Sequence, residues 1–336
     1  SAMGWTTPLA LGPHLLHNRV FVAPMAGVTD RPFRLLAKRL GAQYAVGEMA
    51  ASNAALWASH KTMRRLNHDG EPSPRAIQIA GSDPAMMAEA TTFNMDRGAE
   101  VIDINMGCPA KKVCQKAAGS ALMQDEALVR SILTAVVTAS AGRVPITLKM
   151  RTGYSRSHRN AVTLARMAED LGVAMVTVHG RTREDQYQGH AEYDTIAEVK
   201  SRVRIPVVAN GDIDSCEKAL EVVRHTGADA IMIGRAGQGR PWIYGQVQHF
   251  LLTGERRPDP SLEQIVSLLR AHLLDHYAFH GEASGVRSAR KHIGWTFKGL
   301  GGVRVFREGL EQAETAEAQL DMVDRFASML AERRAA

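Results

Sequence analysis

Eight short apolar runs recur along the first 240 residues, with amphipathic stretches between most of them. The runs are rich in β-branched residues and mostly apolar without alternation, which is typical of parallel strands buried on both faces. Their ranges are 20–25, 44–49, 75–80, 101–106, 145–150, 174–179, 205–210 and 228–234. We interpret them as the strands of an α/β fold.

The intervening stretches predict helices with recognisable ends. The clearest cover 83–97, 125–140, 157–171 and 215–225, and each opens with Asp or Ser as a candidate N-cap. Gly98, Gly172 and Gly227 stand where a helix would end. Eight βα units predict a TIM (β/α)8 barrel. The rival is a doubly wound open sheet, which is disfavoured because no G-x-G-x-x-G follows the first strand.

The pattern changes after residue 252. Residues 253–260 form a polar linker with two prolines, and 261–280, 285–297 and 309–331 show helical spacing of apolar positions. We therefore predict two domains: a catalytic barrel over 11–252 and a small all-helical domain over 261–332.

Composition narrows the class of protein. With 45% apolar and 23% charged residues in 336, the chain has enough apolar side chain for a large core, which excludes a disordered or collagen-like chain. The three cysteines lack C-x-x-C spacing, which disfavours a disulfide framework and a zinc site. We expect a cytoplasmic protein, because no apolar run reaches the roughly 18 residues of a membrane span and no signal peptide is evident.

The positive charge is unevenly distributed. Residues 253–336 balance 12 basic against 12 acidic side chains, so the formal net charge of +6 arises before them. Predicted βα loops carry a basic rim, and one predicted helix face of the second domain carries Arg287, Arg290 and Lys291 at i, i+3 and i+4. The rim comprises Lys111, Lys112, Lys116, Arg151, Arg156, Arg159, Arg181, Arg183, Arg235 and Arg240. We interpret this bias as a surface for a large polyanion, with an ordinary solvated face as the alternative.

In a barrel, chemistry lies where the strands end. Gly211 with Asp212, and Gly234 with Arg235, follow the last two strands and precede helices, which favours a phosphate site built from backbone N–H groups. The alternative is that these glycines only serve tight turns.

Two further strand-end residues suggest a bound heterocycle. Lys149 is suited to a Schiff base, or to a fixed cation beside a flavin that becomes anionic on reduction, and its alternative is a structural ion pair. Gln78 offers a donor and an acceptor to the edge of a planar ring, and its alternative is a satisfied core amide.

Cys108 lies in a Gly-Cys-Pro turn at a strand end. An ordinary thiol pKa of about 8.5 leaves it protonated at neutral pH, so it can donate a proton, although a generic cysteine is a small buried hydrophobe. Because the chain has no H-E-x-x-H, P-loop or carboxylate cluster, we expect no metal.

Several strand-end segments together closely resemble the tRNA-dihydrouridine synthases, particularly the bacterial B type. The segments are 23–34 (APMAGVTDRPFR), 103–112 (DINMGCPAKK), 119–122 (GSAL), 149–153 (KMRTG), 178–183 (VHGRTR), 209–213 (ANGDI) and 233–242 (IGRAGQGRPW). The similarity runs from about residue 11 to the C-terminal helices, where it is less distinctive.

The resemblance implies an FMN-dependent enzyme that reduces the C5–C6 double bond of tRNA uridines with NADPH. Hydride would pass from flavin N5 to uracil C6, and Cys108 would give a proton to C5. The implied cofactor-binding residues are Pro24, Met25, Ala26, Gln78, Lys149, His179, Asn210, Gly211, Asp212, Gly234 and Arg235. The implied substrate-binding residues are Asn105, Lys111, Arg151, Arg181, Arg287, Arg290 and Lys291.

Three other functions remain open at this point. A small-molecule FMN reductase acting on a free pyrimidine would share the flavin residues but has no use for the basic rim. An aldolase or isomerase would use Lys149 and would be colourless. A non-catalytic RNA-binding protein would need neither Cys108 nor the phosphate turns. No protein partner is implied, and we expect a monomer.

Overall fold

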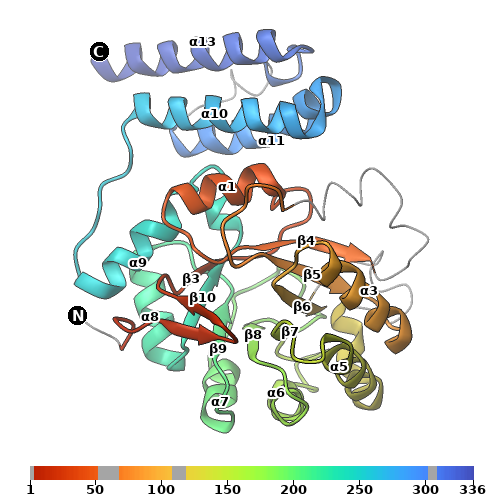
Figure 1. The fold of residues 1–336 in the computed structure, drawn as a ribbon. Coiled ribbons are helices and arrows are strands. Elements are labelled where there is room, and N and C mark those ends of the chain that lie inside the picture. The colour runs from red at the N-terminus through yellow and green to blue at the C-terminus, as the bar shows by residue number, and fades with distance from the viewer. Residues whose placement is uncertain (1–3, 52–67, 108–118, 302–308) are drawn as a thin grey trace. The chain divides into compact units, whose positions relative to one another are not determined.

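The computed structural model describes residues 4–51, 68–107, 119–301 and 309–336. Eight parallel strands form one sheet in the order β3-β10-β9-β8-β7-β6-β5-β4 (Figure 1). They are β3 (Val20–Val22), β4 (Val46–Ala51), β5 (Ala76–Ala80), β6 (Val101–Met106), β7 (Ile146–Arg151), β8 (Met175–His179), β9 (Val207–Asn210) and β10 (Ala230–Ile233). Each lies within or overlaps one of the eight predicted runs, which confirms the predicted barrel.

The two edge strands of this sheet meet and close the barrel. Val22 of β3 forms a parallel bridge with Ala45, directly before β4, and its amide donates to the Tyr44 carbonyl at 3.0 Å. The closed order excludes the doubly wound open sheet.

Helices cover the outside of the barrel (Figure 1). They are α1 (Arg31–Arg39), α3 (Pro84–Asp96), α5 (Glu126–Ser140), α6 (Ala161–Asp170), α7 (Asp194–Arg202), α8 (Cys216–Thr226) and α9 (Ile243–Thr253). The predicted caps Asp83, Asp125 and Ser215 each accept a hydrogen bond from a backbone N–H of the first turn. The helix predicted from residue 157 begins later, at Ala161, because Ser155 and His158 are joined in a turn.

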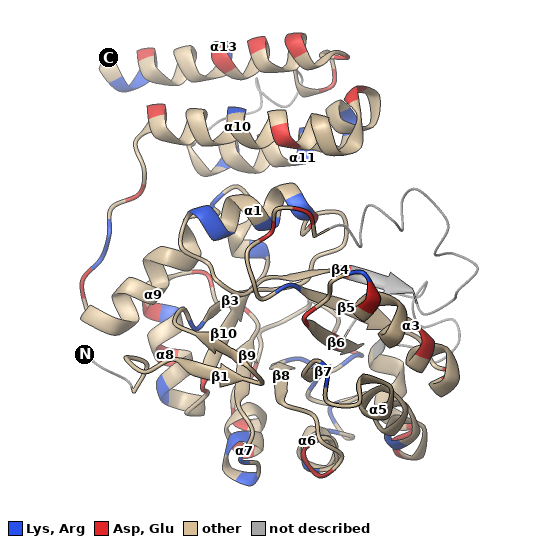
Figure 2. Ribbon diagram, in the orientation of Figure 1, with Lys and Arg blue, Asp and Glu red and all other residues tan. Residues whose placement is uncertain are grey.

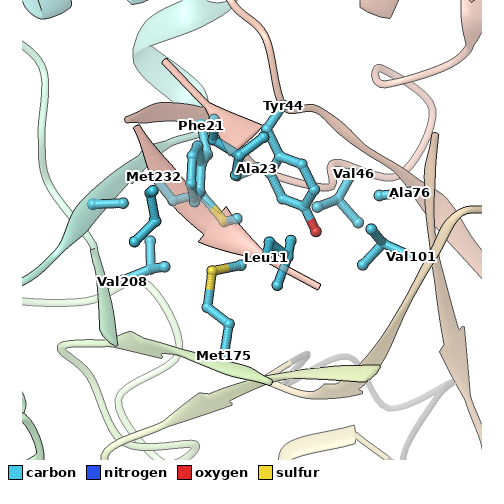
Figure 3. Close-up of a cluster of buried hydrophobic side chains, with 13 residues drawn as sticks. Leu11, Phe21, Ala23, Tyr44, Val46, Ala76, Val101, Met175, Val208 and Met232 are labelled. Atoms are coloured by element: carbon cyan, nitrogen blue, oxygen red, sulfur yellow. The ribbon is translucent and has the colours of Figure 1, made fainter. Parts of the chain in front are cut away.

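A short antiparallel hairpin precedes the barrel and was not predicted. Its strands are β1 (Leu9–Leu11) and β2 (His14–Leu16). Leu9, Leu11 and Leu16 belong to a buried cluster with the first residues of several strands. Figure 3 shows Leu11 among Ala76, Val101 and Met175. The hairpin therefore plugs the end of the barrel where the strands begin.

The chain divides into two compact units. The barrel unit holds residues up to Gly234 and Tyr244–Arg256, and the helical unit holds Arg235–Ile243 and Arg257–Ala336. The predicted domain boundaries, 11–252 and 261–332, run in simple chain order, whereas Arg235–Ile243 packs with the helices. A Cβ added at Gly239 would lie 2.6 Å from the Trp295 backbone carbon, so this segment approaches a helix backbone very closely.

The helical unit contains α10 (Leu262–His280), α11 (Glu282–Gly299) and α13 (Ala316–Ala335). Ser261 and Gln264 form a capping box at the start of α10. The helix predicted over 309–331 begins only at Ala316, after the Thr315 N-cap. Leu273, Phe297 and Phe326 are among the side chains that form the core of the helical unit. None of the helices in the described ranges is long and apolar enough to cross a membrane.

Candidate active site at the carboxyl ends of the strands

The strand register brings the predicted polar residues side by side. Gln78 pairs with Asp103, and Asn105 pairs with Lys149. Arg151 pairs with His179, which in turn pairs with Asn210. Because all the strands are parallel, these residues gather at one end of the barrel, as the sequence predicted.

Asp103 is the buried centre of this group. It accepts hydrogen bonds from Gln78 Nε2 at 2.8 Å and from Thr147 Oγ1 at 2.6 Å. Burial raises the pKa of Asp103, although these two hydrogen bonds and the nearby charge of Lys149 oppose the rise. Since the Gln78 amide donates to Asp103, its orientation is fixed and its carbonyl oxygen is directed elsewhere.

Lys149 and Asn105 lie beside the loop that follows β6. The Asn105 side chain accepts a hydrogen bond from Gly107 N at 2.8 Å. A Cβ added at Gly107 would lie 3.7 Å from Lys149 Nζ, so the loop passes close to the ammonium group. Cys108 follows Gly107 directly, but Cys108, Lys111, Lys112 and Lys116 fall outside the described residues.

Arg151 is buried, with 1% exposure, and its guanidinium binds backbone carbonyls. It donates to Gly107 O at 2.8 Å, to Thr182 O at 3.0 Å and to Gln186 O. Although predicted as a substrate-binding cation of the rim, it ties the loop after β6 to the loop after β8.

Arg181 is likewise buried, with 3% exposure, and connects two strand ends. Its NH2 group donates to both carboxylate oxygens of Asp212, at 2.8 and 3.0 Å, and its NH1 donates to His179 Nε2 at 3.2 Å. Since arginine only donates, His179 Nε2 accepts, and the imidazole is the Nδ1–H tautomer.

The turn after β9 has a left-handed backbone conformation at two successive residues. Gly211 has φ +118°, and a Cβ there would lie 3.0 Å from the Ala191 Cβ and 3.1 Å from His179 Cδ2, so only glycine fits. Asp212 has a left-handed φ of 57°. Its carboxylate is neutralised by Arg181 and accepts from Ala191 N at 2.8 Å. The Asp212 charge is thus already compensated within the protein.

The turn after β3, the first strand of the barrel, lies beside the end of β10, the last strand. Met25 O accepts from the amides of Val28 and Thr29, which forms a tight turn before α1. A Cβ added at Gly234 would lie 3.5 Å from Ala23 Cβ and 3.7 Å from Met25 Sδ. Pro24, Met25 and Ala26 are partly or fully exposed in this turn. Arg235, also exposed, begins the short 3-10 helix η3 (Arg235–Gly237) of the helical unit.

Sequence reasoning missed Thr147 and Tyr187. Thr147 lies two residues before Lys149, on the same face of β7, so strand alternation could have found it. Tyr187 is 54% exposed, its ring lies 5.1 Å from the Arg151 guanidinium carbon and 6.1 Å from the His179 ring. Tyr187 lies in a loop, where no periodic pattern in the sequence could have identified it.

The predicted basic face of α11 is only partly exposed. Arg287 is exposed, whereas Arg290 and Lys291 are half-buried. Arg290 NH2 donates to the carbonyls of Glu311 and Ala313 at 3.4 and 3.3 Å, which ties it to the segment before α13. Figure 2 shows the acidic positions of α13 in red, with basic residues at its C-terminal end in blue.

A closed parallel barrel with a ring of buried polar residues at its carboxyl end defines an α/β-barrel enzyme. The profile of the dihydrouridine synthase (Dus) family matches residues 21–332. The chain belongs to the dihydrouridine synthase family, which confirms the resemblance seen in the sequence.

Relatives are similar over nearly their whole length. The chain is 55% identical over 324 residues to tRNA-dihydrouridine synthase B of Xanthomonas axonopodis, covering 96% of this chain and 97% of that protein. It is 56% identical over 316 residues to tRNA-dihydrouridine synthase B of Pseudomonas aeruginosa, covering 94% and 95%.

Among solved structures, the barrel is similar to that of more distant proteins. An old yellow enzyme homologue from Zymomonas mobilis matches with TM-score 0.51 and 14% identity, covering 77% of this chain and 95% of that one. Histamine dehydrogenase from a Rhizobium species matches with TM-score 0.56 and 14% identity, covering 80% and 50%. At this identity the likeness extends to the fold alone.

Proposed function

We propose that this protein is an FMN-dependent tRNA-dihydrouridine synthase that reduces the C5–C6 double bond of specific tRNA uridines with NADPH. The observation that carries the proposal is the near full-length similarity to two proteins named tRNA-dihydrouridine synthase B. It is supported by the polar ring of strand-end residues, which an aldolase based on Lys149 alone does not require.

The polar residues at the strand ends suit an isoalloxazine, the planar ring system of FMN. FMN would supply the hydride that NADPH provides and that uracil C6 accepts. Gln78, held by Asp103, would offer its carbonyl oxygen to a ring N–H, and Lys149 would place a cation beside the polar edge of the ring. The Pro24–Ala26 turn would pack against the face of the ring.

The turns after β9 and β10 suit a phosphate. We assign Asn210, Gly211, Asp212, Gly234 and Arg235 to the ribityl phosphate, bound mainly through backbone N–H groups. Asp212 would otherwise repel an anion, and its ion pair with Arg181 offsets that repulsion. Arg181 is therefore assigned an indirect role, through Asp212 and His179.

Cys108 is assigned as the general acid that gives its thiol proton to uracil C5. Asn105 and the Nδ1–H of His179 would hold the cofactor or the uracil carbonyls nearby. Arg151 would support the proton donor indirectly, because it binds the carbonyl of Gly107, the residue directly before Cys108. Lys111, in the same loop, remains a predicted phosphate contact of the RNA.

We assign the helical domain to tRNA binding, through Arg287 and Lys291 with Arg290 supporting them. The target uridine must leave its stack to reach a buried centre, so the RNA has to be gripped on both sides of that nucleotide.

Absorption spectroscopy of the purified protein tests the assignment. We expect the near-ultraviolet and blue bands of a flavin, bleached by NADPH and restored by unmodified tRNA. Restoration by free pyrimidines but not by tRNA would indicate a small-molecule reductase. A colourless protein that FMN cannot reconstitute would contradict the proposal and favour the Lys149 aldolase.

Replacement of Cys108 tests the proton donor. Cys108→Ala is expected to bind FMN and accept electrons from NADPH normally, but to reduce tRNA about 10²–10⁴-fold more slowly, the usual contribution of a general acid. Cys114→Ala is the matched control and keeps wild-type turnover. Wild-type turnover by Cys108→Ala would assign the proton to another group.

A further inference from the structure

Three histidines of the helical unit lie together, and none of them has a role in the function proposed above. His272 and His276 are one turn apart on α10, and His292 lies on the adjacent helix α11. Their exposures are 4%, 1% and 3%. The ring centroids are 4.8 Å apart for His272–His292, 5.6 Å for His276–His292 and 5.9 Å for His272–His276.

One nitrogen of each imidazole points towards the other two. The three nitrogens lie within 4.8 Å of one another. Each ring has one nitrogen that is fully shielded from solvent, namely His272 Nε2, His276 Nδ1 and His292 Nε2. The helical spacing i, i+4 on one helix, facing a third side chain from its neighbour, is the arrangement by which helices build metal sites.

A hydrogen-bond chain on α11 fixes the tautomer of His276. Ser288 Oγ donates to Ser284 O at 2.9 Å, so it accepts from His276 Nε2 at 2.7 Å. The proton is therefore on Nε2, which makes Nδ1 the nitrogen that can act as a metal ligand. A metal-bound histidine typically donates its second N–H to such a partner, which orients the ring and makes it more basic.

The surroundings of His292 favour its neutral form. Burial lowers the pKa of His292 well below its ordinary value, and repulsion from His272 and His276 adds to the effect. Neutral imidazole is the form that binds zinc, copper and nickel.

We propose that His272, His276 and His292 form a binding site for one divalent transition metal of the zinc class, which cross-links α10 to α11. At a Zn–N bond of about 2.0–2.1 Å, tetrahedral ligand nitrogens lie about 3.3 Å apart. Side-chain rotations that move the nitrogens by on the order of 1 Å bring them to that spacing. Three protein ligands leave a fourth position for water.

Zinc stoichiometry of the full-length protein tests the site. After removal of metal by a chelator and equilibrium dialysis against Zn²⁺, we expect one zinc per chain by elemental analysis. His276→Leu and His292→Leu, which keep the site apolar and filled, should lose it. His17→Ala, which removes an exposed histidine of the barrel unit, is the matched control and should retain one zinc.

Ser288→Ala tests the geometry more finely, because it leaves all three ligands in place. Loss of the hydrogen bond to His276 Nε2 should weaken zinc affinity about 10–100-fold. Zinc should also raise the Tm of the wild type and leave that of His276→Leu unchanged, since ligand binding stabilises only the state that binds.

Failure of the wild type to take up zinc would overturn the proposal, as would one zinc retained by both leucine variants. Circular dichroism verifies that each variant is folded. FMN content should be the same in all of them, so failure of the metal site is distinguishable from failure of the proposed catalytic function.

Discussion

At the scale of single residues, Glu71 is a buried charge of the barrel unit with three charged or titratable partners. It is buried between Arg34 and Lys38, at 2.9 and 2.8 Å, and it contacts His68 at 3.2 Å. Burial alone would raise the pKa of Glu71, but the hydrogen bond from His68 and the charges of Arg34 and Lys38 lower it far below its ordinary value. The folded state therefore holds this side chain as a carboxylate.

Glu71→Gln is expected to destabilise the fold by about 3–5 kcal/mol, because it leaves buried cations without a counter-charge. Thermal unfolding measures the loss. Asp69→Asn, which changes a side chain 90% exposed nearby, is the control and should have little effect.

The same carboxylate predicts a pH dependence of stability. Because the folded pKa lies below the unfolded value of about 4.3, its stabilisation is complete above that value and is lost as pH falls towards the folded pKa. Between neutral pH and about pH 3, the wild type should therefore lose more stability than Glu71→Gln. Equal losses would show that Glu71 is not the titrating group.

Asp103 is predicted to position the cofactor through Gln78. Asp103→Asn offers one acceptor oxygen where two donors, Gln78 Nε2 and Thr147 Oγ1, now bind. A buried donor without an acceptor costs about 1–3 kcal/mol, so we expect FMN affinity to fall about 10-fold or more. Fluorescence titration measures it, with Asp125→Asn at the α5 cap as the control, and unchanged affinity would contradict this role.

At the scale of elements, long regular patterns were predictable and short ones were not. The eight strands follow from continuous apolar runs, and the site follows from them because parallel carboxyl ends meet. The strands β1 and β2 were missed because the apolar stretches that form them have only two or three residues, whereas the equally short β3 lies in the longer run 20–25. Arg151 and Arg181 look like rim cations in sequence, yet their partners come from distant loops. The histidine cluster likewise exists only once α10 and α11 pack together.

The hairpin β1–β2 offers a matched pair of leucines. Leu11 is 1% exposed within the barrel core, whereas Leu15 is 55% exposed on the next strand. Leu11→Ala should destabilise by about 2–5 kcal/mol and Leu15→Ala by much less, measured as denaturant midpoints. Equal effects would mean that the hairpin does not plug the barrel.

At the scale of the whole molecule, the basic face of α11 should determine RNA affinity. Arg287→Glu with Lys291→Glu should weaken tRNA binding and reduce the slope of log affinity against log salt by about one per lost phosphate contact. Arg290 is left unchanged because it ties α11 to the segment before α13. Reversal of Arg333 and Arg334 at the end of α13 is the control.

Flavin reduction by NADPH should be unaffected in both double variants, since it does not involve the RNA. If tRNA affinity is also unaffected, the helical domain is not part of the binding surface.

The plugged amino end of the barrel has a kinetic consequence. Apolar side chains of the hairpin close that end, so under the proposed function the reductant and the RNA would both approach from the carboxyl end. Two molecules that use the same entrance to the site are expected to bind one after the other rather than together. Initial rates at several fixed tRNA concentrations should therefore give parallel double-reciprocal lines, the signature of a ping-pong sequence. Intersecting lines would mean that the mouth of the barrel admits both at once.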